Sequence, residues 1–297
     1  MCRRDRVYDI YSFWIQATGQ SATPSATKNY TINYVDPFGM EEFLKYYDDV
    51  FFTPELKEII RQNGKGEVYM DSLEISTTNG QTGQFWGYTL LDEFKTRHGY
   101  DLTPYLPFII RTGARWEYTA YLTKMLDSDG VTEEKIRTDL YSTLTDLYVE
   151  NVLSPLKNYL NTEMNMKLRA EIAYNLPYEL SQSALGVDYV ETESLDMGEQ
   201  IESFRGFAGA ANLYGRRLSS ESGALYAQNY VHGAARYLKL FNTQFALSLI
   251  HIWCRQKGRC SGRPMPLPST RAFYRTGGSA RQGRFSGRPS GALPVYG

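Results

Sequence analysis

Acidic residues stand at the ends of four separate runs of β-forming residues. The runs and their acids are "VYMDSLE" (68–74) with Glu74, "KLRAEIA" (167–173) with Glu171, "VDYVETE" (187–193) with Glu191 and Glu193, and "RLSSES" (217–222) with Glu221. If the runs are parallel strands of a barrel, their carboxyl ends converge on one face and the acids surround one cleft. Carboxylates in such a ring repel one another unless a cation, a shared proton or a substrate compensates them. The set therefore predicts a functional site, whereas any one of these glutamates alone is more typical of a solvated loop.

Two kinds of chemistry need several carboxylates in one cleft. Glycoside hydrolysis uses two carboxyl groups, one protonated as an acid and the other ionised as a base or nucleophile. Hard cations such as Ca²⁺ also prefer oxygen ligands. Serine chemistry is poorly supported because "SSES" (219–222) differs from a nucleophile elbow, and His98 is expected to cap or pack a helix end. A zinc site is equally weak, since no His or Cys pair has ligand spacing.

Strand and helix patterns alternate along the first 246 residues and would position these acids. Besides the four acid-bearing runs, strands are predicted at 7–16 and 30–36, and helices at 40–47, 53–64, 132–159 and 198–213. Thr53 is a candidate N-cap, Pro54 takes the first helical position and Gly64 ends the same helix. Strands separated by helices predict a parallel sheet, and no glycine-rich phosphate loop follows a strand. The expected fold class is therefore α/β, as a partial (β/α)8 TIM-type barrel.

Residues 247–297 differ in composition from the rest and are predicted to lack order. They hold eight Arg and one Lys but no Asp or Glu, together with eight Gly and five Pro. A basic arm for nucleic acid or anionic lipid is one interpretation. We expect instead that the tail is not part of the natural protein, because the reverse translation of "LSLIHI" (247–252) is similar to an adaptor used in transposon-made sequencing libraries. The domain would then be 1–246 and the remainder out-of-gene translation. The nucleic-acid interpretation depends on this tail alone, so nucleic acid is not an expected partner. No apolar run is long enough to span a membrane, so a membrane is not an expected partner either.

Longer motifs carry a resemblance to glycoside hydrolase family 106, the α-L-rhamnosidases. "VYMDSLE" followed by "FWGYTLLDEFKTRHGYDLTPYLP" (85–107) resembles a family run in which an Asp-Ser-Leu/Trp-Glu strand end precedes a helix closing in "RxGYDLxPYLP". The similarity continues in "YVENVLSPLKNYL" (148–160), "LRAE" (168–171), "DYVETE" (188–193) and "LYGRRLSSES" (213–222), and upstream in "ATGQSATPSATKNYTINYVD" (17–36). It covers about 7–246, and the spaced acids make it fairly specific.

The resemblance implies a barrel enzyme that hydrolyses terminal α-L-rhamnosides of plant or bacterial polysaccharides with inversion. Glu74 would be the general acid at the end of its strand, with Leu73 facing the core. The base would be Glu221 or Glu193, which the sequence does not rank. Glu221 has the position expected of a partner across the barrel from Glu74, whereas Glu193 lies at the family's other acidic strand end.

The resemblance also implies a calcium ion that helps to hold the sugar. Glu171 and Glu191 are the candidate metal ligands. Asp71, Arg169 and Glu171 are expected to contact the substrate, Asp71 mainly by orienting a neighbouring group. The expected partner is a rhamnose-containing carbohydrate.

Family members are much longer, so the resemblance implies that this chain is a fragment of the catalytic barrel. Early strands would precede residue 7 and a final strand would follow Ala246, so the fragment is expected to be poorly soluble or partly unfolded. The full-length parent would be periplasmic or secreted. One alternative is a glycosidase that acts on another sugar. The other alternative is a protein without catalytic activity, either a barrel that only binds carbohydrate or an inactive fragment.

Overall fold

The structure is a computed structural model and describes residues 10–20, 30–73, 75, 82–112, 120–121, 130–173, 178–194, 200–222 and 233–244. Two predicted features, the general acid Glu74 and the whole of 247–297, lie outside these ranges. Within the ranges, no helix combines the length and the apolar character needed to cross a membrane.

A four-stranded parallel sheet carries the acids, and its strands are the four acid-bearing runs of the sequence. β1 (Glu67–Met70), β5 (Lys167–Ala170), β6 (Tyr189–Glu193) and β7 (Arg217–Glu221) are neighbours in that order. Each neighbouring pair is parallel. All four carboxyl ends therefore lie at the same edge, and the predicted α/β class with a parallel sheet is confirmed. The described strands form an open row of four, which is half the number in an eight-stranded barrel.

The two faces of this sheet differ in polarity because successive side chains of a strand alternate between faces. One face presents Leu168, Ala170, Val190 and Leu218, which belong to the main buried cluster together with residues of the helices. The other face presents a row of four register partners, Tyr69, Arg169, Tyr189 and Arg217. We call this second side the polar face of the sheet.

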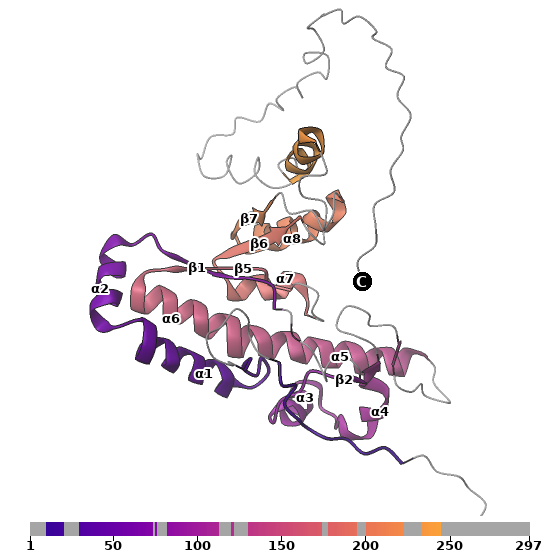
Figure 1. Cartoon of the computed structure of the whole chain (residues 1–297). Helices are drawn as coiled ribbons and strands as arrows, with labels where there is room; N and C mark the ends of the chain where they lie inside the picture. Colours follow the sequence, from indigo (N-terminus) through magenta and orange to yellow (C-terminus); the bar gives the residue numbers. More distant parts are fainter. Residues whose placement is uncertain are drawn as a thin grey trace, which may run out of the picture.

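A long helical tract packs against the sheet, as Figure 1 shows. α5 (Gly130–Tyr148), the π-helical segment η3 (Val149–Leu153) and α6 (Ser154–Met164) follow one another without a break. Leu140, Leu144 and Leu147 are buried along one side of the tract at helical spacing. α6 contacts β5, and α8 (Ile201–Leu213) contacts β6 and β7. The predicted helices at 132–159 and 198–213 are confirmed, and the first extends to Met164.

Of the two N-terminal helices, the second begins and ends where the sequence predicts, and the first begins three residues before the predicted 40–47. α1 (Pro37–Tyr46) continues into the π-helical η1 (Tyr47–Phe51), and α2 (Pro54–Asn63) follows. The Thr53 hydroxyl accepts a hydrogen bond from the Leu56 amide at 3.3 Å, which satisfies one of the free donors of the first turn. Gly64 ends α2 at φ +60°, a conformation that glycine adopts without a Cβ penalty.

The middle of the chain contains short elements, several of which were not predicted. β2 (Thr82–Gly83), β3 (Arg111–Thr112) and β4 (Ala120–Tyr121) form a small antiparallel sheet. α3 (Leu90–His98), η2 (Thr103–Tyr105), α4 (Leu106–Ile109), α7 (Leu180–Ser183) and η4 (Ala184–Gly186) complete the named elements, and a further helix lies at 234–244. His98 Nε2 lies 2.9 Å from Thr143 Oγ1, and its ring packs against Phe94. Its predicted packing role is confirmed.

Two predicted strands are wrong. The described part of 7–16 has no regular structure, and within 30–36 only Tyr30 makes an isolated bridge. The Asn33 side chain accepts hydrogen bonds from the amides of Val35 and Asp36, at 2.7 and 3.0 Å, and turns the chain into α1. This local side-chain turn outweighs the β propensity of the surrounding residues.

Candidate active site

The acids gather at the carboxyl ends of four adjacent strands. Asp71 follows β1, Glu171 follows β5, Glu193 is the last residue of β6 and Glu221 is the last residue of β7. Glu193 and Glu221 are register partners. The structure therefore brings together acids from all four predicted strand ends. Glu74 lies outside the described residues, although its neighbour Leu73 packs against the core as expected.

The hydroxyl of Tyr69 lies at the centre of this group. Its oxygen is 3.1 Å from Glu221 Oε2, 3.2 Å from Glu171 Oε1 and 3.3 Å from Asp71 Oδ1. Burial first, and then the charges of the nearby acids, raise the pKa of Tyr69, so the phenol stays protonated and donates. Asp71 also accepts a hydrogen bond from the Ser72 amide at 2.8 Å. Sequence reasoning did not single out Tyr69, although a residue two positions before a strand-end acid shares its face of the sheet.

Glu171 is the most strongly perturbed carboxyl group of the site. Its side chain is buried, with 2% of the residue exposed, and its second oxygen, Oε2, has no hydrogen-bond partner among the residues that the structure describes. Burial first, and then the charges of Glu193 and Asp71, raise the pKa of Glu171 to about 8. The hydrogen bond from Tyr69 acts in the opposite direction. In the absence of a cation, this group therefore holds a proton at neutral pH.

Arg169 and Glu191 form an ion pair beneath the strand-end acids. Arg169 Nη1 lies 3.1 Å from Glu191 Oε1, and Nε lies 3.5 Å from Glu67 Oε2. The Ser219 hydroxyl donates to the other oxygen of Glu191. Burial raises the pKa of Glu191, and the bonds from Ser219 and Arg169 partly offset that rise. Arg169 also lies over the Tyr69 ring, 4.5 Å from its centroid.

The acids that could hold a cation differ from the predicted ligands, which were Glu171 and Glu191. One oxygen each from Asp71, Glu171 and Glu221 lie within 4.8 Å of one another. Glu171 belongs to the predicted pair, whereas Asp71 and Glu221 were not predicted as ligands. Both oxygens of Glu191 already accept hydrogen bonds from protein groups. Within the described residues, no ion pair joins Asp71, Glu171 or Glu221 to a basic side chain.

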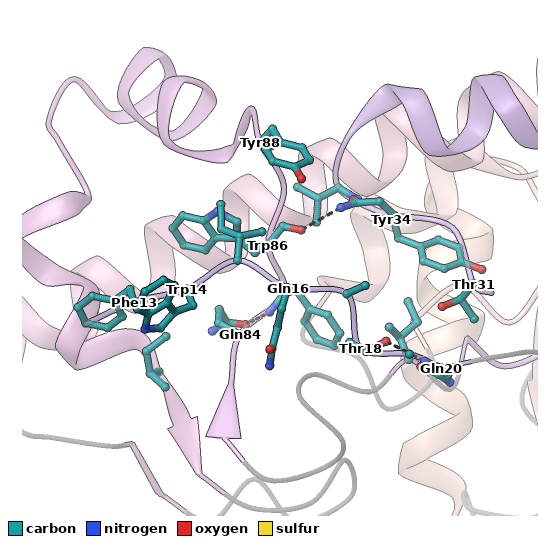
Figure 2. A pocket seen from close by; sticks show the side chains of 18 of the residues that line it. Phe13, Trp14, Gln16, Thr18, Gln20, Thr31, Tyr34, Gln84, Trp86 and Tyr88 are labelled. Carbon is teal, nitrogen blue, oxygen red and sulfur yellow. Dashed lines mark hydrogen bonds between the residues drawn. The ribbon is translucent and has the colours of Figure 1, made fainter. Parts of the chain in front are cut away.

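An aromatic pocket of about 880 Å³ adjoins the segment that follows β1. Ile75 lines it, and Ile75 lies four residues after Asp71, a separation of at most about 14 Å for an extended chain. The other lining residues are 11–20, 30–35, 84–86, Tyr88, Leu106, Ile110 and Tyr178. Figure 2 shows the rings of Trp14, Trp86 and Tyr88 along the same pocket as the Gln84 amide. Among the described residues that line the pocket, none is charged.

The comparisons with known proteins agree with the residue-level resemblance. The family model Glyco_hydro_106, described as alpha-L-rhamnosidase, matches residues 7–252. The chain therefore belongs to glycoside hydrolase family 106, the α-L-rhamnosidase family. The structure titled "Structure of Rhamnosidase from Novosphingobium sp. PP1Y" is similar with a TM-score of 0.55 and 17% identity. The similarity covers 78% of this chain and 21% of that chain, so this chain spans about a fifth of that protein. No curated protein matches.

Proposed function

We propose that the protein hydrolyses terminal α-L-rhamnosides with inversion, using carboxyl groups at the ends of β1, β5, β6 and β7. The observation that carries this proposal is the convergence of Asp71, Glu171, Glu193 and Glu221 at one edge of the sheet in a family 106 chain. The titled activity of the Novosphingobium structure supports the same assignment. We also propose that the four strands are part of a (β/α)8 barrel, whose active sites lie at this edge.

The proposed roles follow from position and exposure. Glu74 is the general acid, because in the sequence it follows the carboxyl end of β1 by four residues. Glu221 is the favoured base, since it is exposed and can reach a water molecule, whereas Glu193 is buried with 5% exposure. Inversion requires the acid and base carboxyl groups to stand roughly 6.5–9.5 Å apart, which leaves room for that water.

The residues present fit the calcium ion that the family resemblance implies. Ca²⁺ binds oxygen at about 2.3–2.6 Å, so two of its ligands lie at most about 5.2 Å apart. The three oxygens of Asp71, Glu171 and Glu221 are within 4.8 Å of one another, and Glu171 offers a buried oxygen that no described residue hydrogen-bonds. When bound, calcium would neutralise these carboxylates and orient sugar hydroxyls. Arg169 would hold the underlying Glu191, which leaves the strand-end acids free to contact the sugar.

The aromatic pocket supports an uncharged glycan as the substrate. Its exposed rings, such as Trp14 at 85% and Tyr88 at 78%, can stack on the apolar face of a pyranose. Amide side chains, such as those of Gln16 and Gln84, can bond its hydroxyls. Because the described lining of the pocket has no basic side chain, we propose that the part of the glycan next to rhamnose is neutral and not a uronate.

The test compares a rhamnosyl disaccharide with an activated aryl rhamnoside in the full-length protein. Glu74→Gln should slow the disaccharide by about 10²–10⁴-fold and the aryl substrate far less, because only the poor leaving group needs the acid. Glu221→Gln should slow both similarly, and NMR of the first product should show the inverted anomer. Unchanged disaccharide turnover by Glu74→Gln would remove the acid role. Glycan binding without turnover by the wild type would favour the non-catalytic alternative.

A further inference from the structure

We infer that Tyr69 is a positioning residue that assembles Asp71, Glu171 and Glu221 into a single cation site. The inference rests on the proposed function for the presence of a cation, and it concerns how the chain prepares that site. The three carboxyl groups supply the negative charge of the site, whereas Tyr69 only positions them. It belongs to β1 and reaches acids that follow or end three different strands.

The hydroxyl geometry indicates a shared contact. Three carboxylate oxygens surround the Tyr69 oxygen at 3.1, 3.2 and 3.3 Å. A phenol has one hydrogen to donate, so it can bond fully to only one of the three at a time. The nearly equal distances mean that no single acid is the dedicated partner. The hydroxyl is a neutral group placed where three carboxyl groups converge, and it holds their oxygens within the 4.8 Å that one cation can bridge.

The Tyr69 ring is itself held by residues outside the three acids. Tyr69 and Arg169 are register partners on β1 and β5, and the guanidinium lies 4.5 Å from the ring centroid. Arg169 is anchored in turn by Glu191, which is only 1% exposed, and by Glu67. The phenol is therefore fixed from its face before any ligand arrives. Such preorganisation is what a partner of metal-ligating carboxylates supplies.

A matched residue on the same sheet separates this role from ordinary packing. Tyr189 lies on the same polar face, and Arg217 lies over its ring at 5.3 Å from the centroid. Tyr69→Phe and Tyr189→Phe thus remove the same hydroxyl from two similar Tyr–Arg pairs. Only the first pair has its hydroxyl among the three acids. Loss of a hydrogen-bond partner of metal ligands typically costs about 10–100-fold in metal affinity.

The experiment is calorimetric titration of calcium into the full chain after removal of bound metal, with far-UV circular dichroism to verify folding. Tyr69→Phe should bind calcium about 10–100-fold more weakly than the wild type. Tyr189→Phe should bind as the wild type does, and Asp71→Asn should lose most binding. Equal affinities for Tyr69→Phe and Tyr189→Phe would overturn the inference. A wild-type chain that binds no calcium would also overturn it, whereas the proposed hydrolysis is judged separately by the Glu74→Gln rates.

A spectroscopic measurement adds a test whose decisive arm uses the wild type and does not depend on the folding of Tyr69→Phe. Terbium takes oxygen ligands as calcium does and emits when a nearby phenol is excited. Wild-type protein and Tyr189→Phe should show tyrosine-sensitised terbium emission that calcium displaces. Folded Tyr69→Phe should lose most of that emission even at saturating terbium. Absence of calcium-displaceable emission from the wild type would place no tyrosine at the cation and would overturn the inference.

Discussion

The Arg169–Glu191 pair should be the main electrostatic support of the polar face, and Arg169→Met tests this. Glu191 is 1% exposed, so loss of Arg169 leaves a buried carboxylate with the Ser219 hydroxyl as its remaining side-chain donor among the bonds described above. Removing one partner of a fully buried pair costs about 3–5 kcal/mol. The Arg169 side chain is 31% exposed, so water compensates part of that loss, and about 2–3 kcal/mol is the expected pair contribution. The contact with Tyr69 adds about 0.5–1 kcal/mol.

The assay is urea unfolding of the full chain without divalent cations, arranged as a double-mutant cycle with Glu191→Gln. Arg169→Met should lower the free energy of unfolding by about 3 kcal/mol. The double variant should be more stable than Arg169→Met alone, because the unpaired charge is gone. Arg217→Met is the matched control, since Arg217 is exposed and its described contact is the Tyr189 ring. A cost below about 1 kcal/mol for Arg169→Met, or no recovery in the double variant, would refute the reasoning.

The pH dependence of the same variant follows from the direction of the Glu191 shift. Burial raises the pKa of Glu191, and Arg169 partly offsets this, so its loss raises the pKa further. A carboxyl group whose pKa is higher in the folded state than in the unfolded state favours folding in its protonated form. Its stabilising effect is present below the unfolded value and is lost as pH rises towards the folded value. The cost of Arg169→Met should therefore be smaller at pH 5 than at pH 8.

Two further predictions concern Glu171 and the aromatic pocket. Because the pKa of Glu171 is raised to about 8, the stabilising effect of its protonated form is present below the unfolded value and is lost as pH rises to about 8. Glu171→Gln should therefore raise the Tm at pH 9 without cations but change it little at pH 4. An equal Tm change at the two pH values would contradict the assigned pKa. Trp14→Ala should weaken binding of a neutral rhamnosyl disaccharide, followed by calorimetry, whereas Tyr46→Ala, at an exposed ring outside the pocket, should not. Equal binding by the two variants would remove the pocket from the glycan site.

Sequence periodicity was sufficient for the sheet and for the position of its acids. The four acid-bearing runs became neighbouring parallel strands because their apolar residues, such as Leu168 and Val190, face the buried cluster. The same reasoning failed at 30–36, where β-forming residues surround Asn33. There the side-chain amide of Asn33 competes for the backbone and makes a turn instead.

The assignment of partners within the site depends on register, which a single sequence does not reveal. Glu191 faces Ser219 because β6 and β7 pair Tyr189 with Arg217 and continue in step. A shift of one residue would place Glu191 on the apolar face. Tyr69 and Glu221 are 152 positions apart in the sequence, and they meet because β1 and β7 belong to the same parallel sheet, with β5 and β6 between them. The residue types at the strand ends predicted which acids gather. The strand register was needed to distinguish the acids that could bind a metal from Glu191, which pairs with Arg169.

The basic side chains of the polar face have partners away from the strand-end acids, so negative charge remains at that edge of the sheet. Tyr69, Arg169, Tyr189 and Arg217 form one row across the four strands, so the two arginines are spaced by aromatic rings. Arg169 is occupied by Glu67 and Glu191, and Arg217 lies over Tyr189. Among the described ion pairs, none extends from this row to Asp71, Glu171 or Glu221. These three acids share the Tyr69 hydroxyl instead, and the pKa of Glu171 among them is raised. A cation that contacts them would therefore supply the positive charge that the sheet does not provide.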